Sequence, residues 1–159
     1  MFDQKKKQLV YIGSDHAGYE AKNELRDKLM TNDDLDVVDL GCFSIDPCDY
    51  PDIAREVSEK VLEHEEARGI LVCGTGEGMA MSANKLKGIR AAHATSEELA
   101  EMSRKHNDAN VIAMGARISK VDEMEKMVDV FLKTDFEKDQ ERHVRRVKKI
   151  DSAIEDNGK

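Results

Sequence analysis

Two short segments of the sequence combine glycines with side chains that can bind anions or move protons. Residues 13–18 read GSDHAG and place Asp15 and His16 between two glycines, as an acceptor beside a titratable donor. Residues 73–78 read CGTGEG, so three glycines follow Cys73 and their backbone N–H groups can point into one space. At the start of a helix such a turn forms an anion pocket, and the same helix start stabilises a thiolate. Proton transfer at Cys73 beside a bound oxyanion is therefore the chemistry that this segment could perform.

A third polar segment, SRKHND at 103–108, joins the end of an expected helix to the start of an expected strand. It contains His106, a second group that can transfer protons, and Asn107. Structural explanations stay open beside the functional ones for each of these segments. Asp15 could simply cap a helix, Cys73 could be a small core residue, and Asn107 could form a turn.

The basic residues of this acidic chain are concentrated near its C-terminus. The net charge is −8, yet residues 138–149 carry six Lys or Arg against two acids. Arg142 and Arg146 lie four residues apart, hence on one side of a helix, and Arg117 follows the last expected strand. Paired arginines suit a phosphate through bidentate hydrogen bonds, although a solvated charged helix is the alternative. The small basic segment favours one phosphorylated small molecule as partner, and neither a nucleic acid nor a membrane is expected.

Apolar, β-branched runs alternate with helical stripes along the chain. Strands are expected over 9–13, 35–40, 69–73, 89–94 and 111–115. Helices are expected from apolar i, i+4 stripes over 21–29, 53–61 and 124–131, from capping-box signatures at 95–98 and 119–122, and from about 138 with Val144, Val147, Ile150 and Ile154 inward. This order predicts one doubly wound α/β domain over 1–159, with its ligand at the carboxyl ends of the strands, where Asp15 and Cys73 lie.

Composition and spacing exclude several other classes of protein. The chain has 159 residues and no apolar run approaching a membrane span, and its first apolar run is too short for a signal peptide. Three cysteines do not make a disulfide framework, so a cytoplasmic, reduced protein is expected. No CxxC is present and the histidines are not at zinc spacing from Cys42 and Cys48, so no metal site is expected. His64, in an acidic helix, and His93, in a buried strand, are expected to be structural.

Taken together, these motifs resemble the ribose-5-phosphate isomerase B family, which also includes the galactose-6-phosphate isomerase subunits. The resemblance extends from about Val10 to Ile154. It rests on GSDHAG at 13–18, DYPD at 49–52, GILVCGTGEGMAMSANK at 69–85, GIRAA at 88–92, SRKHNDANVIAMGAR at 103–117 and ERHVRRV at 141–147. It implies a three-layer α/β/α sandwich with a five-stranded parallel, Rossmann-like sheet and a long C-terminal helix. It also implies a homodimer or a dimer of dimers with active sites at the subunit interface, and neither metal nor organic cofactor.

The resemblance further implies a reaction and the residues that perform it. The reaction interconverts ribose 5-phosphate and ribulose 5-phosphate through an enediolate, with Cys73 as the base and His106 opening the sugar ring. Some members use a Glu at the position of Met79 instead. Substrate contacts are implied for Asp15, His16, Gly74, Thr75, Gly76, Glu77, Gly78, Asn107, Arg117, Arg142 and Arg146, with Asp15 and Thr75 also counted among the catalytic groups. Galactose 6-phosphate or allose 6-phosphate is the alternative substrate, and a non-catalytic flavodoxin-like binding module is a remote alternative.

Overall fold

A five-stranded parallel sheet lies at the centre of the protein, whose computed structural model describes residues 6–156, with side chains as far as Ile154. Residues 1–5 and 157–159, which the predicted domain included, lie outside the described residues. The strands are β1 (Gln8–Ser14), β2 (Leu35–Asp39), β3 (Arg68–Cys73), β4 (Ala91–His93) and β5 (Val111–Gly115). Their order is β2-β1-β3-β5-β4, and the predicted doubly wound sheet is confirmed, with β4 shorter than predicted. The strand order reverses between β1 and β3, which is where such folds bind ligands.

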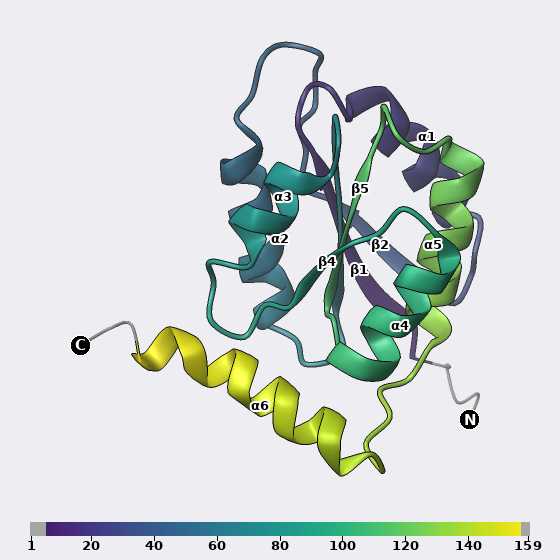
Figure 1. Ribbon diagram of the computed structural model, residues 1–159. Helices are drawn as coiled ribbons and strands as arrows, with labels where there is room; N and C mark the ends of the chain where they lie inside the picture. The colour runs from purple at the N-terminus through teal and green to yellow at the C-terminus, as the bar shows by residue number, and fades with distance from the viewer. Residues whose placement is uncertain (1–5, 157–159) are drawn as a thin grey trace.

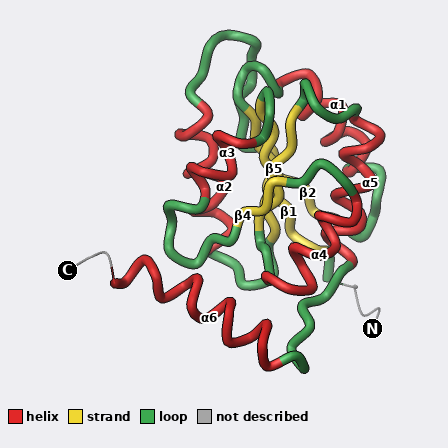
Figure 2. The backbone as a smooth tube through the Cα atoms, in the orientation of Figure 1, coloured by secondary structure: helices red, strands yellow, loops and turns green. Residues whose placement is uncertain are grey.

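Helices cover both faces of the sheet and complete three layers (Figures 1 and 2). They are α1 (Tyr19–Leu29), α2 (Tyr50–Leu62), α3 (Glu77–Ala83), α4 (Glu97–Asn107), α5 (Val121–Lys133) and α6 (Glu141–Asp156). Figure 1 shows α2 and α3 on one face, α1, α4 and α5 on the other, and α6 below the amino ends of the strands. Within residues 6–156, no helix has the length and apolar character needed to cross a bilayer.

Alternate residues of each central strand enter two separate cores. In β3, Ile70 and Val72 pack with α1 and α5, whereas Leu71 packs on the opposite side of the sheet, toward α2 and α3. In β5, Ile112 and Ala113 divide in the same way. Both faces of these strands are therefore buried, and this explains why the strands appear in the sequence as continuous apolar runs instead of alternating ones.

Both predicted helix caps lie one residue later in the structure, and only α5 keeps a reciprocal capping box, since the third residue of α4 is Leu99. Ser96, rather than Thr95, precedes α4, and its Oγ accepts the backbone N–H of Leu99 at 3.2 Å. Before α5, the backbone N–H of Lys120 donates to the carboxylate of Glu123 at 2.7 Å. The physical reason is that a cap must keep an extended backbone, and Ser96 (φ −153°) and Lys120 (ψ 157°) are the residues that do so.

The C-terminal helix departs from its predicted apolar face. It begins at Glu141, slightly later than predicted, and buries Val147 as expected. Ile150 and Ile154, predicted to face inward, are 46% and 37% exposed. Instead, His143 is buried at the start of the helix. Because α6 extends away from the two cores, the C-terminal half of its apolar face, with Ile150 and Ile154, stays exposed within the described part of one chain.

A buried ion pair joins α1 to the end of β2. The fully buried ammonium of Lys22 donates to both carboxylate oxygens of Asp39, at 2.9 and 2.8 Å, and to the carbonyl of Cys42 at 3.0 Å. Arg26 adds a third cationic donor to Asp39 at 2.8 Å. Burial alone would raise the pKa of Asp39, but hydrogen bonds from Lys22, the Gly41 N–H and Arg26 hold this pKa below its ordinary value.

Asp39→Asn is expected to lower the free energy of unfolding by about 3 kcal/mol at neutral pH, because it leaves the buried Lys22 ammonium without its counter-charge. A carboxylate with a depressed pKa contributes stability that is present above about pH 4 and is lost as the pH falls through its folded pKa. The difference between the two proteins should therefore shrink in urea titrations run from pH 7 to pH 3. Asp27→Asn, at an exposed carboxylate beside Arg26, is the control and should cost under about 1 kcal/mol. Equal losses in both variants would contradict the assignment.

Candidate active site

The thiol of Cys73 lies directly against the glycine loop that follows it. Cys73 is the last residue of β3 and is buried, and the backbone N–H of Gly76 donates to its Sγ at 3.1 Å. Gly76 has φ +88°, a conformation that residues with a side chain rarely adopt. This turn carries the chain into α3 and directs a backbone donor at the sulfur. The arrangement can stabilise a thiolate, or an oxyanion that forms beside it.

Asp15 and His16 follow β1, the neighbour of β3 in the sheet, and the strand order reverses between these two strands. The backbone N–H of Asp15 donates to the carbonyl of Val72 at 3.2 Å, which places Asp15 beside the end of β3. The side chain of Asp15 is buried, and one of its oxygens accepts the N–H of Gly18 at 3.0 Å. Asp15 does not cap α1 itself, whose N-cap is Gly18 without a side-chain hydrogen bond. Its carboxyl instead closes the turn before the helix, and this bond holds the carboxyl at this edge. His16 is exposed, with Nδ1 3.3 Å from the backbone nitrogen of Cys48.

Arg117 reaches the same loop from the far side of β3. Gly115, the last residue of β5, pairs with Cys73. Just after it, the backbone N–H of Arg117 donates to the carbonyl of Gly74 at 3.0 Å, so the segment after β5 runs beside the glycine loop. The guanidinium lies against Gly74 so closely that a Cβ built there would be 3.0 Å from Nη1. A cation thus lies against Gly74, the first residue of the loop that follows Cys73, as a phosphate or oxyanion site requires.

The remaining predicted site residues lie at the opposite end of the sheet. His106 and Asn107 end α4, and β5 begins shortly afterwards at Val111, whereas Cys73 pairs with the last residue of β5. A five-residue strand spans about 13 Å, so the two residues lie at opposite ends of β5. Arg142 and Arg146 belong to α6, below the amino ends of the strands (Figure 1). One chain therefore does not bring its own His106 to its own Cys73.

The end of α4 is held in place by a network of ion pairs. Asp108 caps the helix in the left-handed region (φ 47°). Its carboxylate accepts hydrogen bonds from Arg104 at 2.8 Å and from Arg90 at 3.1 Å. Arg90 also binds Asp151 of α6 at 3.0 Å. These contacts fix the segment that presents His106 and join it to α6, so the distant residues form one rigid group.

Within that group, His106 and His143 stack with ring centroids 4.4 Å apart and an interplanar angle of 14°. Glu137 lies 3.4 Å from His143 Nε2, and ligand atoms of all three residues lie within 4.8 Å of one another. Burial, together with the nearby His106 and Arg142, lowers the pKa of His143, while Glu137 opposes the shift. An ion bound to imidazole lies in the ring plane, and two nearly parallel stacked rings share no such position. The three groups therefore need a ring rotation before they could chelate a metal.

Comparison with known proteins identifies the family to which this chain belongs. The sequence matches the family described as Ribose/Galactose Isomerase over residues 10–150. The chain belongs to this family. Ribose-5-phosphate isomerase B of Escherichia coli is 38% identical over 146 residues, covering 92% of this chain and 95% of that protein. The solved structure of Clostridium thermocellum ribose-5-phosphate isomerase B is similar with a TM-score of 0.90 at 42% identity, over 95% of this chain and all of that one.

Family membership makes the protein a sugar-phosphate isomerase. A further relative, YwlF of Bacillus subtilis, is 42% identical over 149 residues, covering 93% of this chain and 98% of that protein. Its name assigns it provisionally to the sugar phosphate isomerases, with no sugar stated. The relatives thus agree on the class of reaction, and the sugar has to be argued separately.

This isomerase has two further side chains at the glycine loop that sequence reasoning had not assigned to the site. Tyr50 begins α2, and its ring lies so close to Gly78 that a Cβ there would be 2.7 Å from Cε2. His93, the last residue of β4, places Nε2 2.9 Å from the carbonyl oxygen of Thr75. Signals for both were present, because Tyr50 is part of the DYPD motif and His93 ends a strand at the ligand-binding edge.

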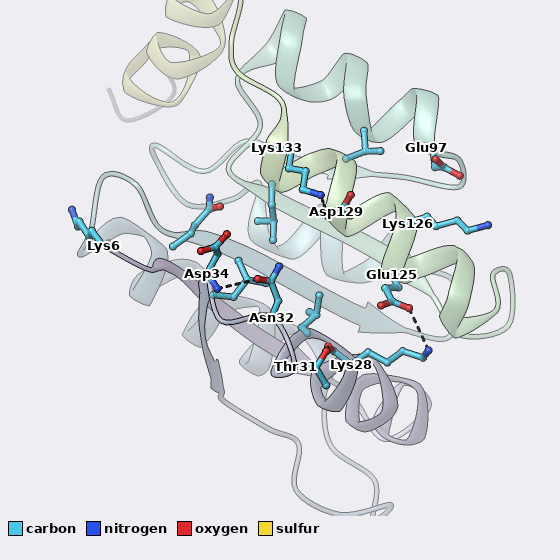
Figure 3. A pocket seen from close by; sticks show the side chains of 15 residues that line it. Lys6, Lys28, Thr31, Asn32, Asp34, Glu97, Glu125, Lys126, Asp129 and Lys133 are labelled. Carbon is cyan, nitrogen blue, oxygen red and sulfur yellow. Dashed lines mark hydrogen bonds and ion pairs between the residues drawn. The ribbon is translucent and has the colours of Figure 1, made fainter. Parts of the chain in front are cut away.

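The isomerase also has a cavity of about 530 Å³ at the amino ends of β1 and β2, between α1 and α5 (Figure 3). Its lining has as many lysines as carboxylates, and two pairs of them are in contact: Lys28 lies 3.3 Å from Glu125, and Lys133 lies 2.6 Å from Asp129. None of the predicted site residues lines it. Its mutually compensated charges do not favour an anionic ligand, so the cavity has no part in the site.

Proposed function

We propose that this isomerase interconverts ribose 5-phosphate and ribulose 5-phosphate by transferring a proton between C2 and C1 of the open-chain sugar. The observation that carries the proposal is the 3.1 Å contact between Cys73 Sγ and the Gly76 N–H at the end of β3. A proton next to a sugar carbonyl is weakly acidic, so a base removes it only if the developing oxyanion is stabilised at once. Preorganised backbone donors contribute several kcal/mol to such stabilisation. The identity to ribose-5-phosphate isomerase B of Escherichia coli supports the pentose.

In the proposed mechanism, His106 first opens the furanose by moving a proton from the anomeric hydroxyl to the ring oxygen. The Cys73 thiolate then takes the proton from C2, a C1–C2 double bond forms, and the electron pair of the carbonyl moves to O1. The N–H groups of Gly74, Gly76 and Gly78 hold the resulting enediolate. The thiol returns the proton to C1, and the hydroxyl proton passes from O2 to O1, which leaves the ketose and restores the thiolate. Asp15, Thr75, Asn107 and His16 contact the sugar hydroxyls in this scheme.

We further propose that each active site is completed by a second copy of the chain, in a homodimer or a dimer of dimers. The separation of His106 from Cys73 along β5 supports this, because the chemistry needs both at one sugar. The exposed Ile150 and Ile154 of α6 supply apolar surface that a second copy would cover. In this arrangement Arg142 and Arg146 of one subunit bind the phosphate together with Arg117 of the other.

Arg142→Ala or Arg146→Ala is expected to raise KM for the sugar phosphate about ten- to a hundred-fold, with a smaller effect on kcat, because a charge-assisted hydrogen bond to the phosphate is lost in both ground and transition states. Arg145→Ala removes the same charge from an adjacent line of α6 and serves as the matched control. Steady-state kinetics at constant ionic strength measures the difference. Similar KM values for all three variants would remove the specific phosphate contacts from the proposal.

The substrate is tested by measuring kcat/KM for ribose 5-phosphate, allose 6-phosphate and galactose 6-phosphate with the purified full-length protein. Ribose 5-phosphate is expected to have the highest value. A higher value for either hexose would overturn the pentose assignment while keeping the class of reaction. Failure to isomerise any of the three, by a folded protein, would overturn the proposed function as a whole.

A further inference from the structure

The ring of His93 is enclosed by three consecutive residues of the glycine loop. Nε2 lies 2.9 Å from the carbonyl oxygen of Thr75, and Nδ1 lies 3.1 Å from a carboxylate oxygen of Glu77. Between them, the ring lies so close to Gly76 that a Cβ built there would be 2.8 Å from Cδ2. The side chain is 24% exposed and reaches the loop from the end of β4, on the opposite side of β5 from Cys73's strand. His93 therefore supports the part of the loop that follows the thiol.

The contact of His93 with Thr75 requires a particular proton. A backbone carbonyl only accepts hydrogen bonds, so Nε2 must carry a hydrogen to bind Thr75. The Glu77 carboxylate lies beside the other ring nitrogen and so fixes the orientation of the ring. Glu77, whose role in the sequence-based prediction was a substrate contact, turns its carboxylate to this ring.

The contact with Thr75 is transmitted to Cys73 through one peptide group. The carbonyl of Thr75 and the N–H of Gly76 belong to the same planar trans peptide and point in opposite directions. The carbonyl points to His93 and the N–H points to Cys73 Sγ, at 2.9 and 3.1 Å respectively. A donor on the carbonyl fixes the plane of this peptide and polarises its N–H, which strengthens the hydrogen bond on the other side.

We propose that His93, oriented by Glu77, is a positioning residue that aims the Gly76 N–H at Cys73 and thereby stabilises the thiolate used for proton abstraction. The inference rests on the proposed role of Cys73 as base. A residue that merely filled space under Gly76 would need only the right volume. A positioning residue needs a hydrogen-bond donor at the place of Nε2, and this requirement distinguishes the two roles.

The other charged groups at this edge stay constant in the test. Asp15 follows β1 and lies beside the end of β3 through its backbone, and Arg117 places a guanidinium against Gly74. His16 follows Asp15 and is exposed. The hydrogen bonds and ion pairs of the His93 ring go to Thr75 and Glu77 and to none of these three residues, so a change in Cys73 reactivity in a His93 variant reports on the peptide plane.

The test measures the rate at which iodoacetamide alkylates Cys73 without substrate, from pH 6 to pH 10, with peptide-resolved mass spectrometry to separate it from Cys42 and Cys48. His93→Leu keeps a similar volume without a donor and is expected to slow alkylation at pH 7 about three- to ten-fold, because a hydrogen bond to a charged group is weakened. The midpoint of the pH profile should move to higher pH, and kcat should fall by a similar factor with KM unchanged. His93→Gln retains an amide donor and should restore most of the wild-type rate.

Three further variants complete the experiment. His64→Leu and His64→Gln place the same substitutions in the exposed turn after α2 and should leave alkylation unchanged. Glu77→Gln removes the charge that orients the ring from a largely exposed position, so it provides the measurement if His93→Leu does not fold, and it should also slow alkylation.

The inference and the proposed function fail in different ways. Wild-type alkylation rates in folded His93 or Glu77 variants would overturn the inference while leaving the isomerase assignment intact. Equal slowing in His93→Leu and His93→Gln would also overturn it, because volume alone would then explain the effect. Absence of isomerisation in the wild-type protein would instead overturn the proposed function, since alkylation needs no substrate.

Discussion

Replacing Cys73 with alanine is expected to abolish isomerisation, with kcat at least about a thousand-fold below wild type, because the general base is removed while the backbone donors remain. Exchange of the C2 proton in D₂O, followed by NMR with ribose 5-phosphate, measures the proposed step directly. Binding of the sugar phosphate, measured by calorimetry, should persist, since Arg117 and the loop N–H groups do not depend on the thiol.

Cys48→Ala is the matched control for this substitution. Burial and the neighbouring Cys42 raise the pKa of the Cys48 thiol to about 12, so Cys48 remains a neutral thiol at physiological pH and cannot act as the base. C2 proton exchange in this variant should match wild type. Normal exchange in Cys73→Ala, or its loss in Cys48→Ala with Cys73 intact, would contradict the assignment of the base.

Mixing two inactive variants is expected to restore activity. Cys73→Ala and His106→Ala should each be nearly inactive, because each removes one partner from every site. In a mixed dimer, one site has both substitutions and the other has neither. If subunits reassociate at random, half of the dimers are mixed and half of their sites are intact, which gives about a quarter of wild-type activity. Co-refolding of differently tagged variants provides the measurement. Mixed dimers isolated through both tags should reach about half of wild-type activity, because one of their two sites is intact.

The structure also provides a control in which mixing should fail. Arg117 and Cys73 lie at the same strand ends of one chain, so in a dimer of Cys73→Ala with Arg117→Ala no site is intact. At limiting substrate this mixture should stay near the activity of its components. Recovery in this pair, or none in mixed dimers of Cys73→Ala and His106→Ala, would show that the two ends of the sheet do not share a site.

Much of the fold and half of the candidate site follow from local patterns in the sequence. Strands buried on both faces appear as short apolar runs, because the apolar side chains of β3 and β5 enter one core or the other. Asp15 and Cys73 could be assigned to one edge because Asp15 directly follows one parallel strand and Cys73 ends another, and parallel strands end together. The glycine spacing after Cys73 predicted backbone donors, and the bond from Gly76 to the sulfur has that form.

Positions that depend on contacts distant in sequence were predicted less well. The caps of α4 and α5 lie one residue later than predicted. The choice between adjacent polar residues depends on which of them has an extended backbone, and local sequence does not determine this. Ile150 and Ile154 have the spacing of a buried stripe, yet periodicity shows only that a face is apolar and does not identify what covers it. His93 was expected to be structural, because it lies in a strand that was predicted to be buried. Its contacts with Thr75 and Glu77 could not be predicted from local sequence, since they join β4 to a loop that follows a non-adjacent strand.

The sequence by itself therefore determined the class of fold, the family and the chemical types of the site residues, because these depend on local spacing and on motifs within single segments. Only the tertiary structure decided which of these residues meet. It placed Asp15, Cys73 and Arg117 at one end of the sheet and His106, Arg142 and Arg146 at the other. The physical reason is the direction of the parallel strands, since residues that follow strands and residues that precede them lie at opposite ends of the sheet. Arg142 and Arg146 precede no strand, and they lie at the second end because α6 is joined there by the ion pair between Arg90 and Asp151.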